Sequence, residues 1–389
     1  MSQVSNRQAE EEQRSCFLVG AFTAESAEEL QLKMEELKGL AEACELTVLD
    51  QFTQQLRKEV PATCIGSGKV RELRMYAEAD GVDCFVFLNH LSPSQISNLS
   101  DALEAEILDR TALILEIFSK RARTAEAVMQ VEYARLQYML PRLVGLRKNL
   151  SRQGGAGGSM SSKGAGEQQI ELDRRRIGKR MSQLRRSLDK IEKTRDVQRQ
   201  KRGRSGVPVI ALTGYTNAGK STLLNYLVRK FGNHEEVLEK DMLFATLDTT
   251  MRRISVPANA DAWESGWPRK ELVIADTVGF ISDLPHDLVK AFRSTLEEVR
   301  RAAVILIVAD SSDKSCEEQI RVTRDTLRDL GVDGIPVITV MNKEDRAVNL
   351  PSAEARRKGR ESGEKIWISA RSGEGIQELI DMLCETLDG

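Results

Sequence analysis

Apolar runs and amphipathic segments alternate along the first third of the chain. The apolar runs, which are short enough to be buried strands, cover residues 16–21, 46–52, 82–88 and 113–118. The segments with helical spacing cover residues 26–44, 69–79 and 94–103. Strands and helices in alternation predict a small α/β domain with a largely parallel sheet over residues 15–118. A polar, acidic tail over residues 1–14, which we expect to be disordered, precedes it.

The next part of the chain predicts a pair of helices. Residues 121–140 carry apolar side chains at helical spacing up to Pro141, which cannot continue a helix. After a glycine-rich segment, a second helix has apolar positions that step by four and three residues, as in a heptad seam: Ile177, Met181, Leu184, Leu188 and Ile191. We therefore predict a long antiparallel helical hairpin over residues 119–204 with a flexible loop over 151–168. The alternative is a linker with a solvated charged helix, which would not need the seam.

Residues 205–389 return to the α/β pattern and begin with a phosphate-binding motif. A buried-strand run over 207–213 leads directly into GxxxxGKS, and an apolar-periodic helix over 222–230 follows. In this context the glycines let backbone N–H groups close around phosphates, and the helix N-terminus adds its dipole. We expect Lys220 to reach the β- and γ-phosphates and Ser221 to bind Mg²⁺. The predicted phosphate-binding residues are Gly214, Tyr215, Thr216, Asn217, Ala218, Gly219, Lys220, Ser221, Thr222 and, from the next motif, Gly279.

A DxxG motif follows a strand-like run over 271–275. Asp276 is placed to hold Mg²⁺ mostly through water, and the N–H of Gly279 can sense the γ-phosphate. The segment is the candidate second switch, formed by Asp276, Thr277, Val278, Gly279 and Phe280. Phe280 stands where Ras-like proteins keep a glutamine that orients the attacking water, so we expect slow intrinsic hydrolysis that a partner accelerates.

The first switch is predicted between these motifs, at Phe244, Ala245, Thr246, Leu247 and Asp248. One threonine here should complete the Mg²⁺ shell in the GTP state and release it after hydrolysis. Thr246 is our assignment, and Thr249 and Thr250 are alternatives that the spacing does not separate. The side-chain oxygen of Asn217, in the phosphate-binding loop, is a candidate ligand for K⁺, whose charge would substitute for an arginine finger.

An NKxD motif at 342–345, after a strand-like run over 335–341, predicts the choice of base. The Asp345 carboxylate can accept hydrogen bonds from both N1–H and N2–H₂ of guanine, which adenine does not offer. Asn342 would brace the loop, and the stem of Lys343 would lie along the ring. The sequence Ser369-Ala370-Arg371 can present a backbone N–H to guanine O6. Four motifs in this order and context predict a P-loop GTPase domain, a mostly parallel sheet with helices on both faces, that binds GTP rather than ATP.

The distribution of charge along the chain indicates a further binding partner. The chain has a net charge of −2, but residues 142–204 hold nineteen basic and six acidic side chains, so that this segment is +13 and the remainder −15. A basic pair of helices with an apolar seam and a mobile tip suits insertion into folded RNA, where phosphate contacts supply affinity.

The remaining composition predicts the compartment. Residues 1–14 are too polar for a signal peptide, and the longest apolar run, 302–309, is far too short to span a membrane. The six cysteines show no spacing typical of zinc or redox sites. We expect a reduced, soluble, cytoplasmic protein that is monomeric when free.

The sequence resembles the HflX family of GTPases over roughly residues 15–389. The resemblance is carried by the phosphate-binding loop at 214–225 and by the stretches 276–281, 284–289 and 291–293. Outside the nucleotide-binding core, it is carried by residues 109–115, 130–132, 140–143 and 172–175.

The resemblance implies a factor that binds the large (50S) ribosomal subunit and reaches toward the peptidyl transferase centre with its hairpin loop. With GTP bound, it would help to separate stalled 70S ribosomes into subunits, and hydrolysis stimulated by the large subunit would free it. The residues then expected to contact rRNA near the tip are Arg142, Arg147, Lys148, Arg152 and Lys163. Those expected to support the base of the hairpin are Arg174, Arg175 and Arg176.

The chain departs from the family's pattern in two places. Residues 163–167 read Lys-Gly-Ala-Gly-Glu where the family usually has Arg-Gly-Pro-Gly-Glu, so the charge survives but the guanidinium and the stiff proline are lost. Thr249 stands where proline is common in the first switch.

Two other functional classes stay open. One is an RNA-remodelling protein whose N-terminal domain uses ATP through residues 66–69, although Gly66-Ser67-Gly68-Lys69 lacks the two-glycine spacing of a P-loop and is better explained as a turn before a helix. The other is a GTP-dependent regulator that acts through protein partners, which leaves the basic segment unexplained.

Overall fold

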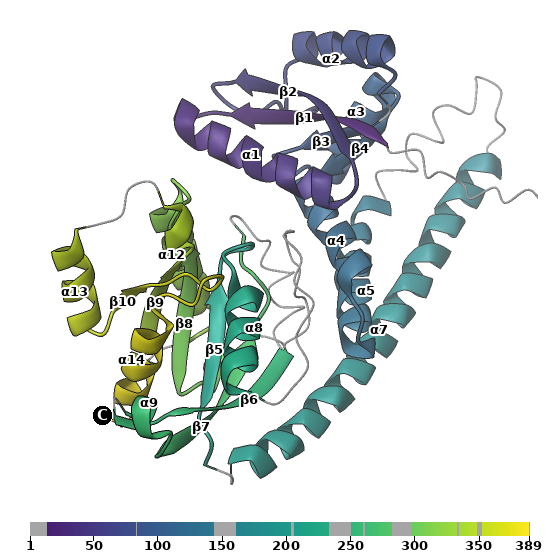
Figure 1. The fold of residues 1–389 in the computed structure, drawn as a ribbon. Helices are drawn as coiled ribbons and strands as arrows, with labels where there is room; N and C mark the ends of the chain where they lie inside the picture. Colours follow the sequence, from purple (N-terminus) through teal and green to yellow (C-terminus); the bar gives the residue numbers. More distant parts are fainter. Residues whose placement is uncertain are drawn as a thin grey trace, which may run out of the picture. The chain divides into compact units, whose positions relative to one another are not determined.

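In the computed structural model the chain divides into two compact units (Figure 1). One comprises Met1–Ile117 with Gln137–Gly178, and the other comprises Phe118–Leu136 with Lys179–Gly389. The structure describes residues 14–82, 84–143, 161–203, 206–232, 250–259, 261–281, 298–332, 334–347 and 352–388, with only the backbone of 161–170, 195–203 and 261. Each unit has a sheet and an apolar core of its own.

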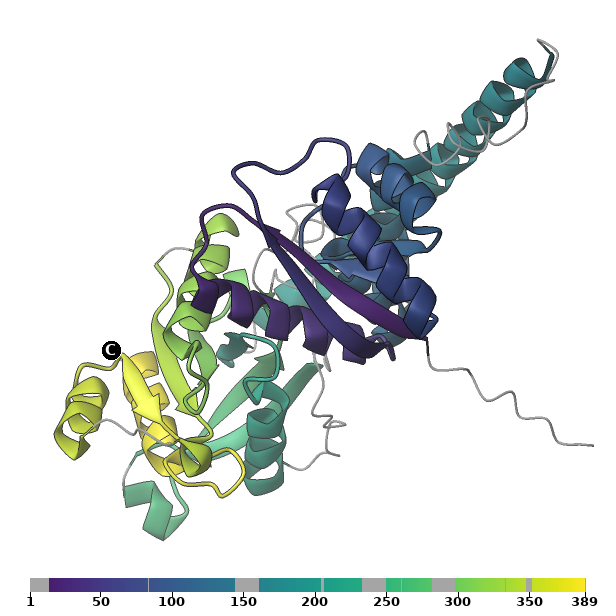
Figure 2. The same ribbon diagram turned by 90° about the horizontal axis from the view of Figure 1, so that it is seen from above.

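The sheet of the first unit has four strands in the order β2-β1-β3-β4, and every neighbouring pair is parallel. The strands are β1 (Ser15–Phe22), β2 (Thr47–Gln55), β3 (Cys84–Phe87) and β4 (Glu106–Asp109). Helix α1 (Ala27–Ala43) covers one face, and α2 (Ser67–Asp80) and α3 (Pro93–Leu103) cover the other (Figures 1 and 2). Because both faces are covered, β1 is apolar and buried almost throughout, as a strand of a parallel sheet should be. The predicted N-terminal α/β fold is confirmed.

One predicted strand is wrong. Residues 113–118 lie in helix α4 (Arg110–Arg121), and the strand is β4, a few residues earlier. The Asp109 carboxylate caps this helix by accepting a hydrogen bond from the N–H of Ala112 at 2.9 Å. A continuous apolar run suits a buried helix as well as a buried strand, so the pattern alone does not decide between them.

Two helices occupy the places predicted for the hairpin. Helix α5 (Ala125–Met139) lies within the predicted segment, whereas α7 (Ser161–Gly203) begins earlier than predicted, inside the segment expected to be a loop. This early part of α7 contains glycines, each of which destabilises a helix by about 1 kcal/mol. Adding residues to a helix that is already nucleated is more favourable than starting a new one, and this offsets the cost. Of the predicted seam, Leu184 is buried and the other four residues are half-buried. Arg180 of α7 donates from Nε and Nη2 to the two carboxylate oxygens of Glu132 in α5, both at 2.7 Å.

The sheet of the second unit has six strands in the order β10-β9-β8-β5-β7-β6. The strands are β5 (Val209–Gly214), β6 (Thr250–Pro257), β7 (Arg269–Asp276), β8 (Val304–Asp310), β9 (Val337–Asn342) and β10 (Lys365–Trp367). Only the pair of β6 with β7 is antiparallel among the described pairs. The strands predicted at 207–213, 271–275 and 335–341 are confirmed as β5, β7 and β9.

Helices cover both faces of this sheet. Helices α8 (Lys220–Phe231) and α14 (Ile376–Asp388) share a core with one face, and α12 (Cys316–Asp329) packs on the other. The connections contain α9 (Asp261–Ser265), the 3₁₀ helix η1 (Glu344–Arg346) and α13 (Ala353–Glu361). The predicted P-loop GTPase architecture, mostly parallel with helices on both faces, is confirmed.

Among the described helices, none is both long enough and apolar enough to cross a membrane. All six cysteines are buried.

Candidate nucleotide-binding site

The phosphate-binding loop lies at the carboxyl end of the central strand β5 and leads into α8. Two of its glycines are required by their surroundings. Gly214 has φ +138°, and a Cβ there would lie 2.1 Å from the carbonyl oxygen of Val308. Gly219 has φ +93°, and a Cβ there would lie 2.2 Å from Nδ2 of Asn342. Side chains are therefore excluded at both ends of the loop, which keeps the backbone close enough to surround a phosphate.

Lys220 is buried at the start of α8. Its Nζ donates hydrogen bonds to the carbonyl oxygens of Gly214 at 3.1 Å and Tyr215 at 2.7 Å. Burial lowers the pKa of Lys220 to about 8, and the nearby carboxylate of Asp276 opposes that shift. The loop thus holds a buried lysine whose ammonium group lies among the loop's own carbonyl oxygens.

Ser221 and Asp276 bring together two oxygen donors. Asp276 ends β7 and is fully buried, and Ser221 Oγ donates to its Oδ2 at 2.8 Å. Hydroxyl and carboxylate oxygens are the ligands that Mg²⁺ prefers. In the part of the chain that the structure describes, no group of three or more His, Cys, Asp or Glu side chains could hold a metal ion. Ser221 and Asp276 are the described oxygen donors placed for a cation here.

The candidate second switch is paired with the phosphate-binding loop. The N–H of Thr216 donates to the carbonyl oxygen of Phe280 at 2.8 Å, and the N–H of Phe280 donates to that of Gly214 at 3.0 Å. Thr277 Oγ1 donates to the carbonyl oxygen of Leu212 at 2.8 Å. The Phe280 ring is buried in an apolar cluster with Val299, Ile305, Ile307 and Leu327. The ring therefore points into the core.

The candidate first switch, Phe244 to Asp248, lies outside the described residues, as does Thr249. Thr250 is described: it begins β6 and pairs in antiparallel register with Asp276.

The residues predicted to select guanine come together at the ends of β9 and β10. Asn342 donates from Nδ2 to the carbonyl oxygen of Ala218 at 2.9 Å, and its Oδ1 accepts from the N–H of Ala370 at 2.9 Å. Ser369 Oγ donates to Asp345 Oδ1 at 2.7 Å, and Lys343 Nζ lies 2.7 Å from Asp310 Oδ2. Asn342 thus joins the phosphate-binding loop to the loop that carries Ser369, Ala370 and the exposed Arg371. The predicted bracing role of Asn342 fits this geometry.

The basic residues expected to contact rRNA are placed differently from one another. Arg174, Arg175 and Arg176 are exposed on α7. Arg147, Lys148 and Arg152 lie outside the described residues, and only the backbone of Lys163 is described.

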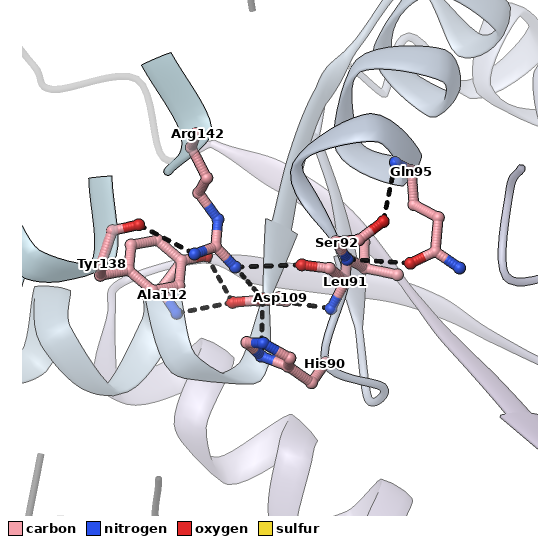
Figure 3. A network of polar contacts seen from close by, with 8 residues as sticks. All are labelled: His90, Leu91, Ser92, Gln95, Asp109, Ala112, Tyr138 and Arg142. Carbon is pink, nitrogen blue, oxygen red and sulfur yellow. Dashed lines mark hydrogen bonds and ion pairs between the residues drawn. The ribbon is translucent and has the colours of Figure 1, made fainter. Parts of the chain in front are cut away.

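Arg142 points inward. Its guanidinium donates to the carbonyl oxygens of Tyr138 at 2.9 Å and Leu91 at 3.0 Å and to the carboxylate of Asp109 at 3.0 Å (Figure 3). It also stacks on the Tyr138 ring, whose hydroxyl donates to Asp109 at 2.6 Å. Sequence reasoning missed this cluster, because Asp109 and Arg142 lie 33 residues apart and Arg142 looks like one more cation of a basic segment. This side chain is not presented to RNA.

Comparison with known proteins finds similarity to one family over most of the chain. Residues 31–119 match the family described as GTP-binding GTPase N-terminal, residues 121–202 the GTP-binding GTPase Middle Region, and residues 209–343 the 50S ribosome-binding GTPase. GTPase HflX of Caldanaerobacter subterraneus subsp. tengcongensis is 42% identical over 92% of this chain and 78% of its own length. GTPase HflX of Escherichia coli is 40% identical over 92% of this chain and 79% of its own.

Among solved structures, the complex of SsGBP with GDP matches 96% of this chain and 98% of its own with a TM-score of 0.51. At 22% identity this likeness concerns the fold alone. The HflX relatives are stronger evidence for the family than this likeness of fold, because their sequences are similar to this one over most of both chains. On this evidence the chain belongs to the HflX family of GTPases.

Proposed function

We propose that this GTPase binds the large ribosomal subunit and helps to separate stalled 70S ribosomes into subunits. The observation that carries the proposal is a basic stripe on α7. Its members are exposed, recur every three to seven residues and lie on the helix face opposite the seam: Arg175, Lys179, Arg186, Lys190 and Lys193. Such a stripe matches the phosphates of folded RNA. The description of the family matched by residues 209–343, a 50S ribosome-binding GTPase, supports the same partner.

The nucleotide roles follow from the geometry of the site. We infer that residues 214–222 and Gly279 hold the phosphates of GTP, and that Asn342, Lys343, Asp345, Ser369, Ala370 and Arg371 hold guanine. Asp345, oriented by Ser369, would accept from N1–H and N2–H₂ of the base.

Mg²⁺ fits the oxygen donors that Ser221 and Asp276 provide. We propose that these residues hold it, Asp276 mostly through water, and that Thr246 joins them in the GTP state. Bound there, the ion would neutralise charge on the β- and γ-phosphates. We also propose a K⁺ ion near Asn217, whose side chain is exposed in the loop.

Intrinsic hydrolysis is proposed to be slow and to be accelerated by the large subunit. The Phe280 ring has no hydrogen-bonding group and is buried in the core, so it cannot orient water. Arg147, Lys148, Arg152 and Lys163 would contact rRNA, with Arg174, Arg175 and Arg176 at the base of the hairpin. Arg142 is not among the residues that we propose to contact rRNA, because its guanidinium is held inside the protein. The protein would work in the cytoplasm and be monomeric when free.

The first test measures GTP and ATP turnover with and without purified large subunits. We expect turnover of GTP and not of ATP, and an increase when large subunits are added. Turnover of ATP would favour the RNA-remodelling alternative. GTP turnover that large subunits leave unchanged would contradict the proposal.

The second test reverses charge on α7 with Arg174→Glu/Arg175→Glu/Arg176→Glu. We expect weaker co-sedimentation with large subunits and a smaller dependence of affinity on salt, since phosphate contacts are lost. The matched control is Arg357→Glu/Lys358→Glu/Arg360→Glu on the exposed face of α13, which changes the net charge equally. Equal binding by the α7 variant and the wild type would remove Arg174, Arg175 and Arg176 from the interface. Equal loss in both variants would show an effect of net charge alone and would contradict a specific contact of these arginines with RNA.

A further inference from the structure

Glu344 carries a nearly buried carboxylate inside the loop that is proposed to hold guanine. It stands between Lys343 and Asp345, and its side chain is only 10% exposed. Taking a carboxylate out of water is costly unless the charge is paired. The partner is Arg356 of α13, whose Nη1 donates to Oε1 of Glu344. The ion pair therefore joins the guanine-binding loop to a helix that comes later in the chain.

Helix α13 lies close to the sheet on the side that carries Arg356. A Cβ placed on Gly359, about one turn further along the helix, would lie 3.2 Å from Cβ and the carbonyl oxygen of Lys365 and from Cζ3 of Trp367. This is a closer approach than most side chains allow, so α13 rests on β10 at this glycine (Figure 1). Residues three apart lie on the same face of a helix. Arg356 is therefore on the face that packs against the sheet, where its position is fixed.

The guanine-binding loop has a backbone conformation that its surroundings must hold. Lys343 has φ +61°, a left-handed conformation that residues with a side chain rarely adopt and that persists only where neighbouring contacts fix it. The N–H of Glu344 donates to the carbonyl oxygen of Ile368 at 3.1 Å. The residue after Ile368 is Ser369, whose hydroxyl donates to Asp345. The backbone and the side chain of Glu344 thus both fix the part of the loop that presents Asp345.

We propose that the ion pair of Arg356 with Glu344 holds this loop in the conformation that binds guanine and so sets how long a guanine nucleotide stays bound. The inference rests on the proposed contact of Asp345 with the base. Arg356 acts through Glu344 and is a positioning residue. Without the arginine, the unpaired carboxylate gains by turning toward water, and the loop leaves its left-handed turn more often. The nucleotide is then released sooner, whereas the phosphate-binding loop around Lys220 is unchanged.

The test measures the release of a fluorescent GDP analogue from Arg356→Met, which keeps an apolar stem but lacks the charge. Excess unlabelled GDP starts the release, and stopped-flow fluorescence follows it. We expect the analogue to dissociate at least fivefold faster than from the wild type. Single-turnover hydrolysis at saturating GTP should stay within twofold, because the phosphate-binding loop is unchanged. A general disturbance of the domain would change both rates, so the split between them identifies a positioning role.

Arg357→Met is the matched control. Arg357 is the next residue of α13 and pairs with Glu361, with 3.4 Å between Nε and Oε1 and with both side chains exposed. This variant removes the same charge from the same helix and should release the analogue at the wild-type rate. The double variant Arg356→Met/Glu344→Gln should release it no faster than Arg356→Met, because both substitutions break one pair. If Arg356→Met does not fold, as judged by its melting temperature, Glu344→Gln alone takes its place.

Four results would overturn the inference. They are an acceleration of less than fivefold in Arg356→Met, an equal acceleration in Arg357→Met, a parallel loss in single-turnover hydrolysis, and effects of the two substitutions that multiply in the double variant. Asp345→Asn separates these failures from a failure of the proposed guanine contact. Unchanged GDP affinity in Asp345→Asn would overturn that contact, whereas a loss there without an effect of Arg356→Met would overturn only the role of the ion pair.

Discussion

Arg142 and Asp109, which lie 33 residues apart in the sequence, form an ion pair with 3.0 Å between Nη2 and Oδ2, and Asp109 is completely buried (Figure 3). The carboxylate also accepts from the N–H groups of Leu91 and Ala112 and from the Tyr138 hydroxyl. The pair therefore ties the end of β4, the start of α4 and the end of α5 to one another. Burial and the adjacent carboxylate raise the pKa of Tyr138 well above its usual range, so this hydroxyl stays a donor at any physiological pH.

We predict that Arg142→Met destabilises the protein by about 3–5 kcal/mol, because it leaves the Asp109 charge buried without its cation. Urea unfolding, followed by a probe in the N-terminal unit, measures the effect. Arg180→Met removes a pair with Glu132 whose arginine side chain is half exposed, so water screens the pair and the loss of stability should be much smaller. Similar costs for the two variants would contradict the buried role of Arg142.

GTP affinity is predicted to fall as the pH rises above about 8. Burial lowers the pKa of Lys220 to about 8, and the protonated form is the one that attracts phosphates. Above this pKa each further pH unit leaves about tenfold fewer protonated molecules, so Kd should rise by up to about tenfold per unit. Titrations of a fluorescent GTP analogue between pH 7 and 9, where guanine keeps its N1 proton, check the slope. A Kd that stays constant to pH 9 would show that Lys220 keeps its proton there.

Asp345→Asn is predicted to change the preferred base from guanine to xanthine. The amide can donate to the 2-oxo group of xanthine but no longer accepts two hydrogen bonds from guanine. We expect GTP affinity to fall at least tenfold, as a lost charge-assisted pair implies, and XTP affinity to rise. Competition of both nucleotides against a labelled analogue measures this. Unchanged GTP affinity would place the guanine contact elsewhere.

Turnover of GTP is predicted to be faster in K⁺ than in Na⁺ buffer, because in the proposed site an oxygen of Asn217 would help to hold the larger ion beside the phosphates. Asn217 has φ +61°, so the control is Asn217→Gly, which removes the side chain and still accepts this backbone conformation. The variant should lose the difference between the two ions. Equal turnover of the wild-type protein in both buffers would remove K⁺ from the mechanism.

Local chemistry made the nucleotide site readable from the sequence. Gly214, Lys220, Asp276 and Asn342 each lie at the carboxyl end of a strand or at the start of the next helix. The carboxyl ends of parallel strands meet at one edge of a sheet, so motif order and strand context predict which side chains converge there. The seam and basic face of α7 were readable for a similar reason, because helical periodicity is a local property.

The tertiary structure decided whatever depends on partners that are distant in sequence. The apolar run at 113–118 became part of α4 because Asp109 caps that helix and the surrounding elements bury it. Arg142 turned inward because Asp109, Tyr138 and Leu91 together repay the desolvation of its charge. The direction of the Phe280 ring likewise depends on which surfaces pack together. Periodicity and motifs therefore determine which groups are present, whereas burial and long-range pairing determine which of them are free to act.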